Sequence, residues 1–368
     1  KEYMVSSFVL IFGITALLTA GAFLFLHPIL KVMHIPADVY DMMFDYMWII
    51  LFGLPFIFLY NYFAFLLRSV GNSVTPLFFL GISTAANIGL DYMFVAVLGW
   101  GVEGAAAATV LAQVLSGIGI AVYTFAREAA LRPRRDELRV NGKILGEIFS
   151  YSAATGAQQS VMNFGILMVQ GLVNSFGTAV MAAFAAGVKI DTLAYMPAQE
   201  FGNAYSIFIS QNYGAGKKER ISRGSRSAAA VVLIFCLAAS AAVFFLARQL
   251  MGIFISPEEE EIIRIGAGYL RVEGACYCGI GILFLLYGYF RAVERPRISL
   301  LLTVISLGTR VALAYACAPV FGVGAVWWAI PAGWALADAA GAVLICAAKA
   351  GPGTGAGTAD CKSGTKIL

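Results

Sequence analysis

Apolar residues form ten long runs along the chain, and short polar clusters separate them. A helix needs about 20 mostly apolar residues to cross a bilayer, so each run predicts a membrane-spanning helix. The expected spans are residues 6–27, 45–67, 77–98, 103–126, 145–173, 179–212, 227–250, 266–290, 298–320 and 323–347. The sixth is longer than one crossing requires, so we expect it either to extend into the cytoplasm or to bend, and Gly187, Pro197 and Gly202 favour a break within it.

Composition narrows the class of protein. Of the 368 residues, 60% are hydrophobic and 12% are charged, whereas about 25% of residues are charged in soluble domains. A soluble fold of this length needs more charge to cover its surface. The composition therefore excludes a soluble enzyme, a disulfide scaffold and a nucleic-acid-binding module, and it predicts an all-α polytopic membrane protein.

Basic residues predict the orientation. Nineteen of the 25 lysines and arginines fall on alternate connections, six of them between Arg127 and Lys143, while the opposite connections hold the acidic run Glu258–Glu261. The positive-inside rule places the basic connections and the C-terminus in the cytoplasm. We therefore expect a multi-pass protein of the plasma (inner) membrane. Residues 349–368 are Gly-rich and polar, which predicts a disordered cytoplasmic tail.

The chain repeats itself with an offset of 223 residues. Ten of 37 ungapped positions are identical, among them Arg68 with Arg291 and Gly99 with Gly322. Both copies have the same orientation, which predicts a parallel repeat of two pseudo-symmetric six-helix lobes. The second copy has two spans upstream with no counterpart in the first. We therefore expect ten of twelve helices in this chain, with about 80 residues carrying the first two helices absent.

The expected organisation follows from this repeat. An N-terminal lobe at 1–126 would hold the third to sixth helices of the full fold. A cytoplasmic loop at 127–143 would join it to a six-helix C-terminal lobe at 144–348.

Three oxygen-bearing side chains in the first lobe form a candidate ion site. Asn87 and Asp91 are four residues apart and so share one face of a helix. Asp91 lies eight residues before the turn at Gly99, about 12 Å deep at 1.5 Å per residue, and Thr109 lies at the same depth on the returning helix. One carboxylate among neutral oxygens suits Na⁺ or a proton. A hydrogen-bonded clamp between two helices is the alternative interpretation.

The second lobe has no equivalent, because Asp91 aligns with Ala314. Its polar residues predict a substrate cavity formed by Gln159, Asn163, Lys189, Asp191 and Glu200. Lys189 and Asp191 are two residues apart, so each needs a partner on another helix, and a structural ion pair is an equal alternative to a substrate role.

Other polar and aromatic residues receive structural interpretations. Glu273 and Arg310 fall near expected helix ends, where an arginine reaches toward the interface, and three tryptophans predict an interfacial belt: Trp327, Trp328 and Trp334. No P-loop and no HExxH or GxSxG motif occurs, so we expect neither an ATP site nor an enzyme.

Several motifs together resemble one transporter family. They are Thr75-Pro76, NIGLDY at 87–92, GWGVEGAAAAT at 99–109 and QNYGAGKKER at 211–220. In this order they resemble the multidrug and toxic-compound extrusion (MATE) family, over about residues 1–348. The resemblance implies twelve helices in two lobes and Na⁺- or H⁺-coupled efflux of amphipathic, often cationic compounds.

The resemblance also bears on the ion site. In one branch of the family an Asn and an Asp four apart on the fifth helix join a Thr on the sixth, matching Asn87, Asp91 and Thr109. A further Asp on the family's first helix would complete that site, but that helix is missing here. Another branch has an acidic residue on the seventh helix, where this chain has Gln158-Gln159. This departure argues for a coupling role of Asp91.

We therefore predict a secondary antiporter that exports amphipathic or cationic drugs or toxic metabolites in exchange for Na⁺ or H⁺ by alternating access. We expect a monomer in the lipid bilayer, with no cofactor beyond the coupling ion, no ATP and no nucleic acid. A flippase or exporter of lipid-linked saccharides or polysaccharides, from the same superfamily, is the alternative.

Overall fold

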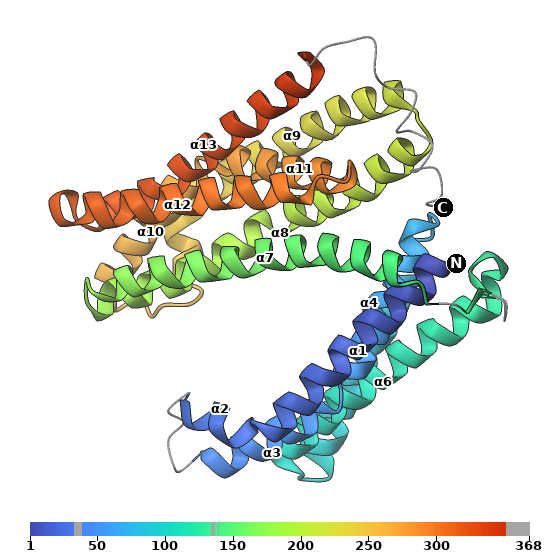
Figure 1. Cartoon of the computed structure of the whole chain (residues 1–368). Coiled ribbons are helices and arrows are strands. Elements are labelled where there is room, and N and C mark those ends of the chain that lie inside the picture. Colours follow the sequence, from blue (N-terminus) through green and yellow to red (C-terminus); the bar gives the residue numbers. More distant parts are fainter. Residues whose placement is uncertain (33–38, 134–136, 139, 351–368) are drawn as a thin grey trace. The chain divides into compact units, whose positions relative to one another are not determined.

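The computed structural model describes residues 1–32, 39–133, 137–138 and 140–350, and within these ranges every regular element is helical. Residues 351–368, most of the predicted tail, lie outside the described ranges. The chain forms two compact units, Lys1–Phe149 and Ser150–Leu368. Figure 1 labels most of the helices of each.

The first unit is built around one long helix. Its elements are α1 (Glu2–Leu24), α2 (Leu26–Val32), α3 (Tyr40–Leu51), α4 (Leu54–Ser69), α5 (Val74–Asp91), the π-helix η1 (Tyr92–Val97), α6 (Gly101–Arg127) and the 3₁₀ turn η2 (Ala129–Leu131). Helix α6 packs against α3, α4 and α5, and α1 packs against α4. A small core forms where α4 meets α6, with Leu67 and Ile120 fully buried.

The second unit has a larger core. Its helices are α7 (Gly142–Asn174), which begins just before the boundary between the units, α8 (Thr178–Gly214), α9 (Lys218–Met251), α10 (Glu260–Gly274), α11 (Tyr277–Ala292), α12 (Pro296–Phe321) and α13 (Val323–Ala350). Helix α8 packs against α9, α10 and α11, while α12 and α13 form an adjacent pair. Figure 1 shows α12 and α13 leaving a common turn and diverging. Helix α8 is continuous although it contains Pro197, so the break predicted there does not occur.

Helix boundaries repeat with the offset of 223 residues. Two spans predicted as single helices are each broken, α3–α4 by a 41° bend and α10–α11 by a 52° bend. The breaks fall at residues 52–53 and 275–276, which are equivalent positions in the repeat. The helix pairs also correspond, since α4 packs on α6 as α11 packs on α13. These shared breaks and contacts support the internal repeat found in the sequence.

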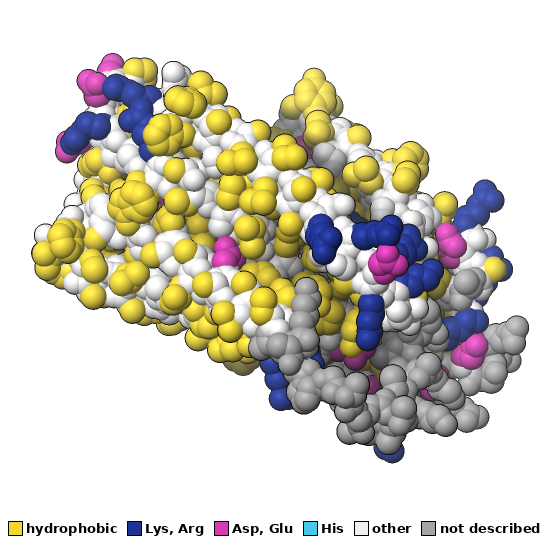
Figure 2. All heavy atoms as spheres, turned by 90° about the horizontal axis from the view of Figure 1, so that it is seen from above, with side chains coloured by type: hydrophobic (Ala, Val, Ile, Leu, Met, Phe, Trp, Pro, Cys, Tyr) yellow, Lys and Arg dark blue, Asp and Glu magenta, His cyan; other side chains and the backbone are white. Residues whose placement is uncertain are grey.

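Several helices meet the length and apolarity needed to cross a membrane. In the described part of the chain there are seven, and each of the two bent pairs meets the same requirement when taken as one span. Helix α7 is long enough but is not among them, because Gln158, Gln159 and Asn163 lower its apolar content. Large apolar side chains face outward, including Leu17, which is 73% exposed, and Phe245, which is 75% exposed. Figure 2 shows hydrophobic side chains over much of the visible face, with Lys and Arg gathered into a few clusters.

Candidate functional site

The predicted ion site lies where α5 packs against α6. The Asn87 amide donates a long hydrogen bond, 3.5 Å, to the Thr109 hydroxyl. Thr109 in turn donates to the Ala105 carbonyl at 3.0 Å, which leaves its lone pairs to accept from Asn87. The structure thus brings two of the three predicted side chains together.

Asp91 occupies the junction between two kinds of helix. It is the last residue of α5, and the backbone continues from it as the π-helix η1. π-Helical turns occur frequently at functional sites, because the widened turn changes the direction of side chains. Asp91 is partly buried, and its carboxylate makes no hydrogen bond or ion pair within the described ranges. Nor do those ranges contain a group of three or more His, Cys, Asp or Glu side chains that could hold a metal. The role of Asp91 in ion coupling stays a prediction.

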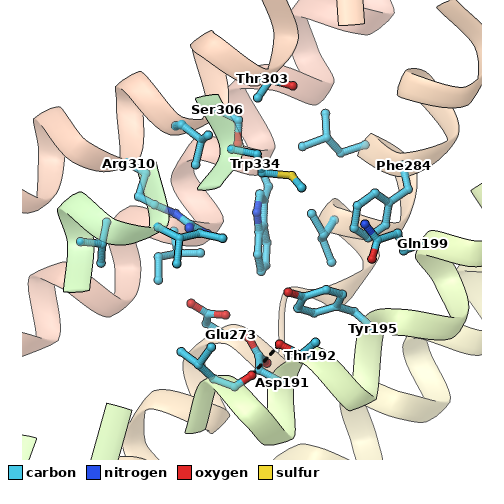
Figure 3. Close-up of a pocket in the computed structure, with 18 of the residues that line it drawn as sticks. Asp191, Thr192, Tyr195, Gln199, Glu273, Phe284, Thr303, Ser306, Arg310 and Trp334 are labelled. Carbon is cyan, nitrogen blue, oxygen red and sulfur yellow. Dashed lines mark hydrogen bonds between the residues drawn. The ribbon is translucent and has the colours of Figure 1, made fainter. Parts of the chain in front are cut away.

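The second unit contains a cavity of about 350 Å³, which is within the size range of small-molecule sites. Side chains from α7, α8, α10, α11, α12 and α13 line it. Figure 3 shows ten of them labelled, with polar and aromatic groups pointing into the same space. Its aromatic walls include Tyr195, Phe284 and Trp334.

Two carboxyl groups enter this cavity from neighbouring helices. Asp191 of α8 is 3% exposed and accepts hydrogen bonds from the Tyr269 hydroxyl, at 3.2 Å, and from the Tyr277 hydroxyl. Glu273 of α10 is 2% exposed, and its Oε1 has no hydrogen-bond partner. The two acids interact electrostatically, and Figure 3 shows their carboxyl groups side by side.

Local structure explains how these groups meet. A Cβ atom at Gly187, one turn before Asp191, would lie 2.6 Å from the Tyr269 ring, so only glycine lets that ring lie against α8 and bond the acid. The chain bends at residues 275–276, between Glu273 and Tyr277. This bend directs both side chains toward Asp191. Trp327 closes the cluster, with its ring centroid 4.9 Å from that of Tyr269.

One arginine shares the cavity with these acids. Arg310 of α12 lines the cavity and interacts electrostatically with Glu273. Its Nε is buried and has no hydrogen-bond partner. In the register of the repeat, Arg310 is the equivalent of Asn87, so the second unit holds a fixed cation where the first offers a neutral amide.

Comparison with known proteins gives a family assignment. The model of the family described as MatE matches residues 1–93 and 154–316, which is more than half of the chain. The chain belongs to the MatE family. Members of this family are transporters rather than enzymes, and this chain is accordingly a multi-pass membrane protein. The matched segments include Asn87, Asp91, Asp191, Glu273 and Arg310.

Curated MatE relatives include two bacterial proteins. The probable multidrug resistance protein YpnP of Bacillus subtilis is 27% identical over 307 residues, covering 83% of this chain and 68% of YpnP. The probable multidrug resistance protein NorM of Thermotoga maritima is 26% identical over 285 residues, covering 76% of this chain and 61% of NorM. The chain therefore spans about two thirds of the length of these relatives.

A solved structure shows the same fold. The MOP superfamily transporter from Pyrococcus furiosus superposes with a TM-score of 0.87 at 22% sequence identity, covering 95% of this chain and 79% of that one. At this identity the likeness shows the fold alone.

Within this MatE fold, the predicted cavity residues separate into two groups. Gln159 and Asp191 line the cavity of the second unit, whereas Asn163, Lys189 and Glu200 are exposed and lie outside its lining. For Asn163 the cause is helical spacing, because the lining face of α7 runs through residues 159, 162, 166 and 169.

Helical direction also explains the other two placements. Lys189 lies two residues from Asp191 and therefore points away from it, and it makes no ion pair within the described ranges. Glu200 instead accepts a hydrogen bond of 3.4 Å from Asn203 on its own helix. The ion pair of Lys189 or Asp191 with a residue of another helix, which was the structural alternative, is therefore not observed within the described ranges.

Residues that sequence reasoning set aside form much of the cavity. Glu273 and Arg310 were expected near helix ends, yet both line it. The predicted tryptophan belt is wrong for two of its three members, since Trp327 and Trp334 are each 4% exposed and pack inside the unit, while Trp328 is 60% exposed. For Glu273 and Arg310 the sequence did contain a signal, because a charged residue within an apolar run marks a candidate functional position. It contains no clear signature of the bend that directs Glu273 into the cavity.

Proposed function

We propose that this MatE protein is a secondary antiporter that exports amphipathic, cationic compounds in exchange for Na⁺ or H⁺. The observation that carries the proposal is the cavity in the second unit, where buried Asp191 and Glu273 face aromatic walls. An ionisable group at membrane depth costs roughly 2.5–3.5 kcal/mol on insertion scales and is by default functional. Two adjacent carboxyl groups attract a cation because it relieves their mutual repulsion. The aromatic faces suit the apolar part of such a compound.

Coupling is assigned to the first unit. The linked Asn87 and Thr109 side chains and the unpaired Asp91 carboxylate offer oxygen ligands of the kind that Na⁺ prefers, or a site for a proton. The sequence has no P-loop, which supports ion-driven transport without ATP or another cofactor.

Exchange requires that the two binding events oppose each other. If the conformation that binds the ion at Asp91 binds the exported compound weakly, ion entry shifts the population toward release. By linkage, the compound must weaken ion binding by the same factor. We propose that the protein performs this cycle as a monomer in the plasma membrane. The basic connections support a cytoplasmic C-terminus.

The lipid-linked saccharide alternative is less favoured by the cavity. Such lipids carry phosphate groups, which two buried carboxyl groups repel, and Arg310 is a single opposing cation.

Ethidium efflux from cells that express the full-length protein tests the proposal. Na⁺ and pH gradients are imposed separately, and loss of ethidium fluorescence is followed in wild type and in Asp91→Asn. We expect the variant to lose gradient-dependent efflux, because an amide replaces the only carboxylate of the cluster, while its amount in the membrane is unchanged. Asp45→Asn, the same change at an exposed position of α3, is the matched control and retains efflux. Unchanged efflux in Asp91→Asn contradicts the coupling role, and no efflux in wild type contradicts the transport proposal.

A further inference from the structure

An open groove lies between α8 and α9, which pack against each other, and it shares no lining residue with the cavity described above. Its volume is about 310 Å³. The lining positions follow helical spacing on both helices, at 201, 204, 205 and 208 on α8 and at 224, 227, 228 and 231 on α9. Seven residues of a helix rise about 10 Å, so the groove follows the two helices for roughly that length.

The groove is built into the contact between the two helices. A Cβ atom at Gly224 would clash with the Phe208 ring, so glycine at this position lets the ring lie against α9. The hydroxyls of Tyr205 and Ser225 share a hydrogen bond of 2.7 Å, which ties α8 to α9 at the same level. Carbon atoms form nearly all of the groove's surface, and Val231 on its wall is 50% exposed. The groove is therefore a fixed apolar surface that stays open.

A cluster of basic side chains lies at one end of this groove. Residues 217–226 contain five basic residues and one acid. Arg220 precedes Gly224 by four residues, and Arg223 precedes Ser227 by four, so both arginines lie on the face of α9 that lines the groove. All five basic side chains are exposed, and together they are called the basic cluster below: Lys217, Lys218, Arg220, Arg223 and Arg226.

These charges are available to an anion. Arg220 takes part in no ion pair of 4.0 Å or less within the described ranges. Arg223 pairs with Glu219, but both side chains are more than three quarters exposed, and such surface pairs contribute little. Side chains of a helix lean toward its N-terminus. The two guanidinium groups therefore extend past the end of the groove, where α9 begins, and leave the apolar part open.

The groove lies where α9 enters the apolar layer. The 21 residues from Ser227 to Ala247 contain no charge and are enough to cross the hydrocarbon core. The groove thus begins near the membrane surface, on the side that the basic connections predict to be cytoplasmic, and continues into the lipid. The positive-inside rule explains the charges but not the apolar groove beside them. A soluble partner does not reach such a groove, whereas a lipid does.

We propose that the groove and the basic cluster together bind an anionic phospholipid. One acyl chain lies in the groove against Phe208 and Val231, and Arg220 and Arg223 hold the phosphate. Anionic lipids of the cytoplasmic leaflet attract basic segments at this level. A zwitterionic lipid carries a cationic group that the basic cluster repels. The inference uses none of the residues that line the transport cavity and does not depend on the proposed antiport.

Two phospholipids that differ only in the headgroup test the selection. Purified, delipidated full-length protein is titrated with palmitoyl-oleoyl phosphatidylglycerol or phosphatidylcholine, and bound lipids are counted by native mass spectrometry. A Lys or Arg beside an anionic headgroup corresponds to roughly fivefold in affinity, so two correspond to roughly thirtyfold. We therefore expect wild type to bind the first phosphatidylglycerol roughly thirtyfold more tightly than phosphatidylcholine. Equal affinities would overturn the inference.

Charge-removing variants locate the headgroup. Arg220→Gln combined with Arg223→Gln is expected to weaken phosphatidylglycerol binding roughly thirtyfold and to change phosphatidylcholine binding by less than about threefold. The matched control combines Arg295→Gln with Arg297→Gln, two exposed arginines at the start of α12 and on the same predicted side of the membrane, and keeps both affinities. An equal loss in the two double variants would mean general attraction by positive charge and would overturn the site.

A groove-filling variant locates the acyl chain. Ser227→Trp places a ring in the groove and leaves the basic cluster intact. Displacing two methylene groups corresponds to roughly tenfold or more, so phosphatidylglycerol binding should weaken by at least that factor. Ser222→Trp, at an exposed position on a different face of α9, is the control and retains binding. Unchanged binding in Ser227→Trp contradicts the proposal.

Two further outcomes concern other occupants of the groove. Glycerophosphoglycerol, the headgroup without acyl chains, is expected not to displace phosphatidylglycerol, and displacement would overturn the role of the groove. A delipidated dimer of wild type that Ser227→Trp abolishes would assign the groove to a second copy of the chain instead. The experiments on wild type need no variant to fold. None of them needs an ion gradient or an exported compound, so their failure leaves the proposed antiport standing.

Discussion

A close approach of α8 to α11 depends on two glycines, Gly202 and Gly288. A Cβ atom at Gly288 would lie 2.6 Å from the Gly202 carbonyl oxygen, and one at Gly202 would lie 3.0 Å from the Phe284 carbonyl oxygen. Ordinary carbon–oxygen contacts are about 3.3–3.6 Å, so Gly288→Ala requires the helices to separate by roughly 0.7–1 Å. Because the obstacle is backbone, no side-chain rotation relieves it.

Two opposing effects set the size of the change. Overpacking of this kind costs typically about 1–3 kcal/mol, and alanine gains about 1 kcal/mol over glycine in helix propensity. Gly268→Ala on α10 is the matched control, since its Cβ would meet nothing within 4 Å. The propensity gain is common to both variants, so the difference in unfolding free energy between them is the overpacking cost, about 1–3 kcal/mol.

Thermal unfolding of the purified protein, followed by tryptophan fluorescence, measures this difference. With about 2–4 °C per kcal/mol for large domains, Gly288→Ala should unfold at least about 2 °C below Gly268→Ala. The variant should also export ethidium more slowly, because α8 and α11 carry Asp191 and Phe284 in the cavity wall. An unfolding temperature equal to or above that of the control would refute the reasoning, because the backbone contact would then be easily relieved.

Two further substitutions test single contacts. Tyr277→Phe removes one of the two hydroxyls that bond Asp191. It should lower the unfolding free energy by about 1–3 kcal/mol, measured by the same thermal assay. An unchanged unfolding temperature would show that the remaining contacts of Asp191 suffice for stability. Thr109→Val keeps the shape but removes the hydroxyl bonded to Asn87. If Na⁺ drives efflux, it should raise the Na⁺ concentration for half-maximal ethidium efflux roughly tenfold, and an unchanged concentration would argue that Thr109 acts only in helix packing.

Hydrophobic patterning predicts much of the fold, because in a membrane protein it reports directly on which segments cross the lipid. The predicted span 103–126 corresponds to α6 at Gly101–Arg127, and 323–347 corresponds to α13 at Val323–Ala350. The 223-residue repeat likewise anticipates equivalent boundaries. The breaks at residues 52–53 and 275–276 were missed, because a bend between two apolar segments leaves the apolar pattern intact.

The candidate sites were predictable only where neighbours in sequence are also neighbours in space. Asn87 and Thr109 meet because depth on two helices joined by a short turn can be counted from that turn. The second unit's cavity instead joins Asp191 to Glu273, 82 residues away, and to Arg310, 119 residues away. One sequence does not show which faces of such distant helices meet. The interior tryptophans were misplaced for the same reason.

The break between α10 and α11 also bears on how the protein enters the membrane. At 1.5 Å per residue the 15 residues of α10 reach about 22 Å and the 16 of α11 about 24 Å, so neither crosses a hydrocarbon layer of about 30 Å by itself. Helix α10 also carries Glu260, Glu261, Arg264, Arg271 and Glu273, which oppose its separate insertion. Stable insertion of α10 therefore depends on the strongly apolar α11 and on helices that are already in the membrane. We expect α10 to insert late in biogenesis and together with its neighbours.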